Sequence, residues 1–508
     1  MRPFARFTTC SALALGVAAG PAAADLTAQE VWDGMQSAMQ NYGYTVDATQ
    51  TPNSGGLDVS DVSMRIDFPE NEGTVSFVIP ELELEENSDG SVSMTFPAAM
   101  PITIDATPKD DDAVNMVLDY ANSGLELIVS GDPSKMTYTY DAEQMSITLA
   151  ELTINGDVIG RDKARFEFVM EGLSGVTTIA SGSTTEISQD MRADTARYDL
   201  AFNDPESDDV ALVTGSLAAL YIESSTELPE GFDPSDAQSL AAGGFSGGGK
   251  MGYEDGNMQF AVTDDEGTTT GTTRSGTVAL AFEMNSELMR YDVAATDQEV
   301  GLTGPEMPVP VNFSMAESAF SFTAPIAASE TPQDMAFGLT LGGFEMADVL
   351  WNMVDPSATL PRDPATIALD VTGQVTPFVN LFDPAEMEKI EDTGAAPGEL
   401  NTLTLNNLTV EVAGARLGGT GSFTFDNDDT ETFDGFPRPT GAVNLTLDGA
   451  NGLIDKLIAM GVLTQEDAMG ARMMMSMFAV PGDSPDSLKS SIQINEQGHV
   501  LANGMRIQ

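Results

Sequence analysis

A glycine-flanked serine is the first place where this sequence could carry chemistry. Gly244-Phe-Ser246-Gly-Gly248 matches G-x-S-x-G, the turn that exposes a nucleophilic serine to a histidine base. The sequence has one histidine, His499, so no other residue could serve as that base. No apolar strand pattern precedes the motif and no helix-forming run follows it. We therefore interpret the motif as a chance match in a run rich in Gly and Ser, and His499 as a solvated residue of a turn.

The same glycines also fit the G-x-x-x-x-G-K pattern of a phosphate-binding loop, from Gly244 to Lys250. Met251 occupies the position at which that motif needs Ser or Thr to bind magnesium. We therefore expect no phosphate-binding loop here.

Two further clusters could hold metal ions. The acid-rich segment 426–434 offers oxygen ligands for calcium, but it lacks the ligand spacing of a calcium loop, so a solvated loop is favoured. Met473, Met474, Met475 and Met477 would suit a soft metal. On a helix, methionines more often fill gaps in a core, and we predict that these four pack against a sheet. No sequence signature selects a glycosidase carboxylate pair from the 79 acids, so we expect no catalytic residue, metal or cofactor.

Charge and composition exclude several classes of protein. The 508 residues include 79 Asp and Glu against 21 Lys and Arg, a formal net charge of -58. A surface this acidic repels nucleic acid and anionic lipid headgroups alike. One His and one Cys cannot build the common zinc, haem or iron–sulfur centres. The hydrophobic content of 42% is nevertheless high enough for a folded protein.

The N-terminus has the pattern of a secretory signal peptide. Arg2 and Arg6 precede a short apolar run at 11–20, and Ala22-Ala-Ala24 supplies the small residues of a cleavage site. We predict a signal peptide over residues 1–24, cut between Ala24 and Asp25. Cys10 lies inside this segment, so the mature chain would be free of cysteine, which favours a bacterial periplasm or exterior. No later run reaches 18 apolar residues, so we expect no transmembrane span in the mature chain.

Alternation of apolar and polar residues with a period of two predicts β-strands along most of the chain. Val62, Met64, Ile66 and Phe68 illustrate the pattern. Short turn sequences such as Asn155-Gly-Asp157 separate the runs and favour antiparallel hairpins. We predict a mainly β protein, built either as a long curved antiparallel sheet or as a β-sandwich.

Helices are expected mostly at the two ends of the chain. Thr27-Ala-Gln-Glu30 forms a capping box before a helix to about residue 42. A short helix is expected at 346–354 and a helical hairpin at 450–461 and 464–479, before two last strands at 490–495 and 499–507. We divide the mature chain into a helix and β region at 25–205, a stretch of loops with some strands at 206–275, and a second β region at 276–508. Within the middle stretch, 243–249 and 264–273 are predicted to be flexible loops.

The C-terminal third resembles an uncharacterised family of secreted bacterial proteins, defined as a domain of unknown function. The similarity is carried by LTLNNLTVEVAGARLGGTGSFTFD at 403–426, by 441–463 and by 494–508. The segment 25–44 and the VSDVSMRID run after it are also similar to that family. More loosely, the G-x-x-L-x-G-x-G rhythm between strands at 414–425 resembles envelope proteins of the AsmA type. That resemblance implies a long curved sheet with an apolar groove, associated with lipid handling.

These patterns lead to a non-enzymatic, exported β protein. The working hypothesis is that it binds or shields an apolar envelope ligand such as a lipid, because a long series of one-face-apolar strands needs something to cover it. A self-buried sandwich that binds envelope proteins is the alternative, and a secreted hydrolase is a third reading. The contact residues and the oligomeric state are left open by the sequence.

Overall fold

The computed structural model describes residues 26–41, 43–67, 73–108, 112–203, 207, 209–232, 239 and 243–507. The cleavage site predicted at Ala24 and Asp25 lies outside these residues.

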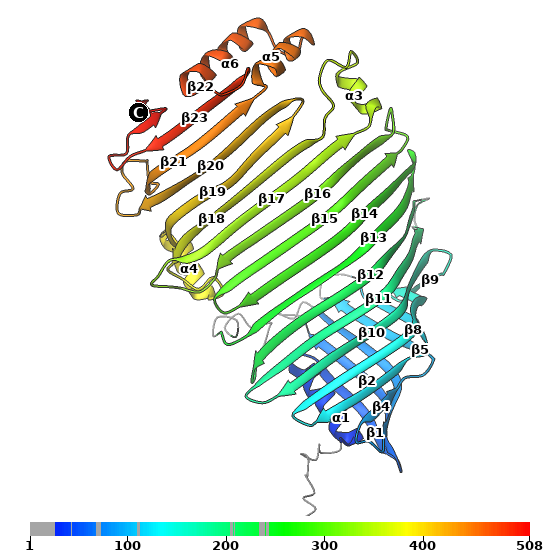
Figure 1. Cartoon of the computed structure of the whole chain (residues 1–508). Helices are drawn as coiled ribbons and strands as arrows, with labels where there is room; N and C mark the ends of the chain where they lie inside the picture. The colour runs from blue at the N-terminus through cyan, green and yellow to red at the C-terminus, as the bar shows by residue number, and fades with distance from the viewer. Residues whose placement is uncertain are drawn as a thin grey trace, which may run out of the picture.

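The described residues form one long antiparallel sheet of 25 strands, which account for 65% of the chain (Figure 1). From β8 onward almost every long strand pairs with the next one along the chain, so the sheet is a meander. The mainly β prediction is confirmed, and of its two forms the structure adopts the curved sheet. The first strands are β1 (Thr45–Pro52), β2 (Gly56–Asp67), β3 (Gly73–Glu86), β4 (Val92–Thr95), β5 (Ala99–Pro108), β6 (Val114–Ser123), β7 (Glu126–Asp132), β8 (Lys135–Ile154) and β9 (Asp157–Ile159).

The central strands are long, because their alternation continues for up to 20 residues without a turn signal. They are β10 (Ala164–Ser181), β11 (Thr184–Asn203), β12 (Val210–Pro229), β13 (Ser246–Asp264), β14 (Gly267–Asn285), β15 (Leu288–Thr303), β16 (Val311–Pro325), β17 (Gln333–Met346), β18 (Ala365–Pro377) and β19 (Gly398–Val412). The last strands are β20 (Ala415–Asp426), β21 (Arg438–Asp448), β22 (Val480–Pro481), β23 (Ser487–Ile494), β24 (Val500–Ala502) and β25 (Met505–Arg506).

The structure corrects most of the two loops predicted at 243–249 and 264–273, although residues 243–245 lie outside a strand as expected. Ser246 to Gly249 begin β13 and pair with β12 and β14 on both sides, and the turn between β13 and β14 is confined to the residues around 265–266. Runs rich in glycine resemble loops, but glycine can stand in a strand that is paired on both edges, and threonine favours strands. Strand pairing is therefore continuous through this part of the sheet.

The described helices lie where they were predicted, with one addition in the described part of the chain. They are α1 (Ala28–Asn41), α3 (Asp348–Val354), α4 (Pro384–Thr393), α5 (Ala450–Ala459) and α6 (Gln465–Phe478). The capping box of α1 is formed, since Glu30 N–H donates to Thr27 Oγ1 at 3.2 Å and Thr27 N–H donates to Glu30 Oε2 at 2.9 Å. The sequence analysis missed α4, although Asp383 before Pro384 and Gly394 after the helix are the usual signals for its start and end.

The densest core surrounds α1. Val31 and Trp32 of α1 are fully buried against the apolar faces of β2, β3, β4 and β7, where Leu57, Leu84 and Val129 are also buried. Figure 1 shows α1 at the N-terminal end of the sheet. Here the helix and the sheet bury each other's apolar surface. Among the residues that the structure describes, the central strands have no such helix packed against them.

The central sheet is a single layer. The accessible surface is 29,317 Å², whereas a compact protein of this mass exposes about 18,000 Å². From β12 onward, the buried apolar side chains are scattered single residues such as Leu228, Ala295 and Ile326. Both faces of these strands therefore contact solvent over most of their area.

A line of bulges crosses the sheet and bends it. Residues with positive φ lie at matching levels of neighbouring strands, and two of the strand pairs shift register there. A bulge bends its strand and increases the local twist. We call this line the crease; it includes Gly172, Ala219, Asp255, Asp297 and Gly343. Each bulge adds one residue, so the alternation shifts by one position and apolar side chains stay on the same face above and below the crease. The cluster around Leu173 is an example, because it contains Met170 on one side of the crease and Met191 on the other.

Candidate ligand-binding face

One face of the sheet is a continuous apolar surface, which we call the inner face. Directly paired residues of an antiparallel sheet project to the same face, so the strand register defines rows of neighbours. Three such rows cross ten strands, from β13 to β23, and none of their residues is charged. The middle row is Met251, Leu280, Val293, Phe320, Leu339, Leu369, Leu408, Gly419, Leu445 and Ser490. The rows beside it run from Gly249 and Phe282 to Ile492, and from Tyr253 and Val278 to Leu488.

The inner face continues into the core at the N-terminal end. Met136 of that core pairs with Ile179, and the same row passes through Ile187 to Met284 and Met289. The face that α1 covers and the face left open in the central sheet are therefore one surface.

The centre of the inner face carries exposed aromatic and methionine side chains, which we call the central patch. Tyr291 and Phe320 lie with ring centroids 6.3 Å apart, and Phe320 meets Phe337 edge-on at 5.7 Å. Exposed fractions remain high despite these contacts, at 44% for Phe282 and 36% for Phe320. The other exposed members of the patch are Met251, Met289 and Tyr291.

The helical hairpin α5–α6 covers the inner face at the C-terminal end (Figure 1). An apolar cavity of about 390 Å³ lies between α6 and the sheet, lined by Met475 and Phe478 on the helix and by Leu417, Leu447 and Leu488 on the strands. Thr464 caps α6 as predicted, because its hydroxyl accepts the Asp467 N–H at 3.1 Å.

The predicted packing of the α6 methionines is wrong for two of the four. Met473 and Met477 are 63% and 58% exposed and do not line the cavity. Met475 is half-buried in the cavity wall, and Met474 also lines the cavity although it is 63% exposed. A single-layer sheet offers one surface to the hairpin, so only one side of α6 finds a partner. Met473 and Met477 form an exposed stripe with Met469.

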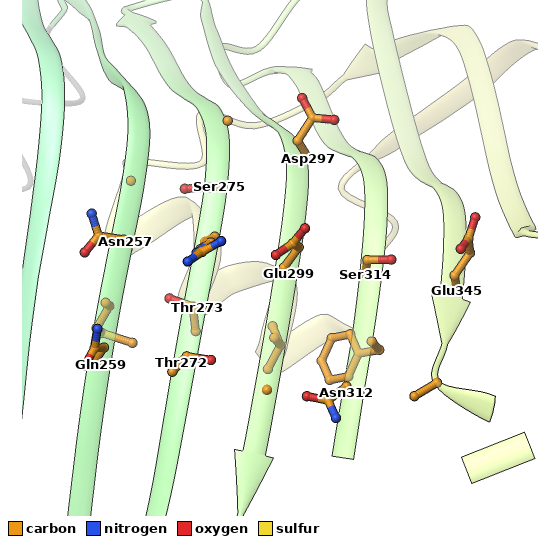
Figure 2. A pocket seen from close by; sticks show the side chains of 18 of the residues that line it. Asn257, Gln259, Thr272, Thr273, Ser275, Asp297, Glu299, Asn312, Ser314 and Glu345 are labelled. Atoms are coloured by element: carbon orange, nitrogen blue, oxygen red, sulfur yellow. The ribbon is translucent and has the colours of Figure 1, made fainter. Parts of the chain in front are cut away.

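A groove of about 930 Å³ lies on the opposite, outer face (Figure 2). It follows the crease across β13 to β17, where polar residues pair in register: Asn257 with Arg274, Arg274 with Glu299, and Ser314 with Glu345. Figure 2 shows Asn257 on β13, Glu299 on β15, Ser314 on β16 and Glu345 on β17 at similar levels of the sheet, with β14 between the first two. Its lining mixes apolar side chains such as Phe313 and Met346 with the carboxylates of Asp255, Asp297, Glu299 and Glu345. It therefore lacks the predominantly apolar lining expected for a lipid site.

The serine and histidine singled out in the sequence lie far apart. Ser246 is the first residue of β13, whereas His499 follows β23, nine strand spacings away, or about 40 Å along the sheet. Ser246 sits in a regular antiparallel pair with Glu227 and Asn285, without the sharp turn of a nucleophile elbow. His499 lies in a turn, where its backbone N–H donates to the Asn495 side chain at 3.0 Å. These two residues do not form a catalytic pair.

The acid-rich loop after β20 is held by an arginine. Arg438 binds the carboxylates of Asp426 and Asp429, and Asp429 also accepts the Thr432 N–H at 3.1 Å. Hydrogen bonds from Thr432 and the nearby Arg438 guanidinium lower the pKa of Asp429. Among the residues that the structure describes, no group of three or more His, Cys, Asp and Glu side chains is placed to hold a metal ion. Within the same residues, no helix has both the length and the apolarity to span a membrane.

These features define a class of protein: a single-layer antiparallel β-sheet with one long apolar face, capped by helices at both ends. The chain belongs to a bacterial family described as an uncharacterized protein conserved in bacteria, DUF2125, whose family model matches residues 254–507. The match contains the C-terminal motifs on which the resemblance was based, and the 25–44 segment lies outside it. No curated protein and no solved structure matches the chain.

Proposed function

We propose that this protein binds a lipid along the inner face of its sheet, as an exported, non-enzymatic carrier or shield. The observation that carries the proposal is the uncharged apolar surface that spans ten strands from β13 to β23. Among the described residues, helix α6 packs over its C-terminal end, and α1 covers the continuation of the same face at the N-terminal end of the sheet. Exposed apolar area costs about 25 cal/mol per Å², so such a face favours an apolar occupant.

The dimensions of the face suit alkyl chains. Ten strands at about 4.8 Å spacing give an apolar strip of roughly 45 Å, longer than a compact small molecule requires. The central patch is exposed to solvent, and its Phe282 and Phe320 rings offer flat apolar surface for chain packing. Export follows from the signal-peptide pattern at residues 1–24, and an exported protein meets lipids at the cell envelope.

The alternative of a self-buried scaffold has less support. It requires a second sheet against the inner face, and the described residues place all strands in one sheet. A second copy of the chain could supply that sheet, which makes self-association one outcome of the test below.

Native mass spectrometry of the chain, purified from a bacterial periplasm without detergent, tests the proposal. We expect adducts that solvent extraction identifies as lipid. A well-folded protein of apo mass that takes up no lipid from vesicles would overturn the proposal. A dimeric mass without lipid would favour two sheets packed face to face.

A matched pair of variants locates the binding. Phe282→Asp places a carboxylate in the central patch at a position that is already 44% exposed, so the fold tolerates it, and we expect at least a tenfold loss of bound lipid. Thr323→Asp adds the same charge to the outer face, where residue 323 pairs with Arg290. We expect Thr323→Asp to bind lipid as the unchanged chain does. Equal binding by both variants would place the lipid elsewhere.

A further inference from the structure

The Lys and Arg residues of the central and C-terminal strands lie on one face of the sheet. Strands β13 to β23 carry six Lys and Arg side chains, and strand alternation places all of them on the outer face. Several are also engaged by acids there, as Arg290 is by Asp292 at 2.7 Å and Arg416 by Glu411. These residues are Lys250, Arg274, Arg290, Arg416, Arg438 and Lys489. A ligand on the inner face therefore meets no strand-borne cation.

The edge beside the central patch is strongly acidic. It consists of the turns that follow β14, β16, β18, β20 and β23, at residues 286–287, 326–332, 378–397, 427–437 and 495–499, which we call the acidic rim. The rim contains twelve Asp and Glu residues and one cation, Lys389. Five of the acids lie on or next to α4, including Glu388, Glu391 and Asp392.

We infer that the lipid bound on the inner face has a headgroup without net negative charge, such as a zwitterionic aminophospholipid. This inference rests on the proposed function and names its ligand class. Acyl chains that lie on the inner rows bring the headgroup to the edge of the sheet, because no charged residue stands in the rows to receive it. At the acidic rim an anionic phosphate is repelled, whereas the ammonium of a zwitterionic head is attracted.

Because salt screens distant charges, the nearby acidic rim, and not the net charge of the whole protein, selects the headgroup. At physiological salt the Debye length is about 8 Å, so charges farther away are screened. The opposite ends of the strands lie about 60 Å from the rim, since β14 has 19 residues at about 3.3 Å each. The carboxylates of Asp265 and Glu266, in the turn at that far edge, therefore contribute little to headgroup choice.

A competition experiment tests the inference. The purified chain is incubated with vesicles that contain equal amounts of phosphatidylethanolamine and phosphatidylglycerol with identical acyl chains, then separated and extracted. We expect protein-bound phosphatidylethanolamine to exceed phosphatidylglycerol by about fivefold at about 0.01 M salt, falling toward equality at about 1 M, where the Debye length is about 3 Å. Equal amounts at low salt, or an excess of phosphatidylglycerol, would overturn the inference. Absence of both lipids would instead overturn the proposed function.

Charge reversal at the rim separates local from global electrostatics. The double variant Glu391→Lys with Asp392→Lys changes the last turn of α4, which has no basic residue. The new lysines also interact favourably with the negative end of the helix dipole, so the helix should stay folded. Asp265→Lys with Glu266→Lys is the control, since either double variant raises the net charge from -58 to -54. We expect the lipid ratio to fall by at least twofold in the rim variant and to stay unchanged in the control. Equal shifts in both variants would show that the rim does not select the headgroup.

Discussion

Asp486 holds the start of α5 by accepting two hydrogen bonds from one residue, Asn451. Its Oδ1 accepts the Asn451 backbone N–H at 3.0 Å and the Asn451 side-chain amide at 2.8 Å. Its Oδ2 accepts the Gly452 N–H at 2.8 Å. Gly449, the residue before the helix, has positive φ and no side chain to cap the helix, so Asp486, next to β23, performs the capping from 35 residues away. The helical hairpin is thereby tied to the strand that it covers.

Asp486→Ala removes this cap and loosens the hairpin. We expect the opening free energy of the α5 amides, measured by native-state hydrogen exchange, to fall by about 1–2 kcal/mol. Asp483→Ala is the control, because Asp483 is exposed and makes a surface ion pair with Lys489, worth about 0–1 kcal/mol. A smaller effect of Asp486→Ala than of Asp483→Ala would contradict the capping role.

Acid weakens the same cap. Burial alone raises the pKa of Asp486, but the hydrogen bonds from Gly452 and Asn451 and the charge of Arg472 outweigh it, so the pKa is lowered on folding. A carboxyl whose pKa is lower in the folded state contributes stability above its unfolded pKa of about 3.9, and that contribution is lost as pH falls through the folded value. We expect the protection of α5 to decrease below about pH 4 in the unchanged chain. Asp486→Asn cannot titrate, so the protection of α5 in this variant should no longer decrease because of this residue as the pH falls. Identical pH profiles of α5 protection in both proteins would argue against Asp486 as the titrating group.

A tyrosine ring covers a glycine across β11 and β12. Tyr198 and Gly215 are directly paired, and a methyl group on Gly215 would collide with the Tyr198 ring and lie 2.6 Å from the Asn257 carbonyl oxygen. We expect Gly215→Ala to destabilise the sheet by about 1–3 kcal/mol, because the ring or the strand must move. Gly247→Ala is the matched control, since its nearest neighbour would be Thr226 Oγ1 at 3.9 Å. Chemical denaturation of the two variants checks this, and equal stabilities would mean that the ring does not require the glycine.

Local sequence rules predicted most elements because each signal lies within a few residues. Thr27 with Glu30 and Thr464 with Asp467 begin α1 and α6 as the capping patterns indicate. The rules failed where glycine and threonine sit inside long strands, as at Ser246 to Gly249, because pairing with β12 and β14 outweighs local preference. They also failed for Met473 and Met477, whose exposure depends on how many layers surround α6.

The sequence by itself determined the antiparallel β class, the positions of the terminal helices and the excess of acid, because alternation, capping and composition are local properties. Only the tertiary structure decided that the strands join in one layer, that apolar rows stay on the same face across the crease, and that the acids after β14, β16 and β18 gather beside that face. Those outcomes depend on register and bulges summed over ten strands, which no short stretch of sequence specifies.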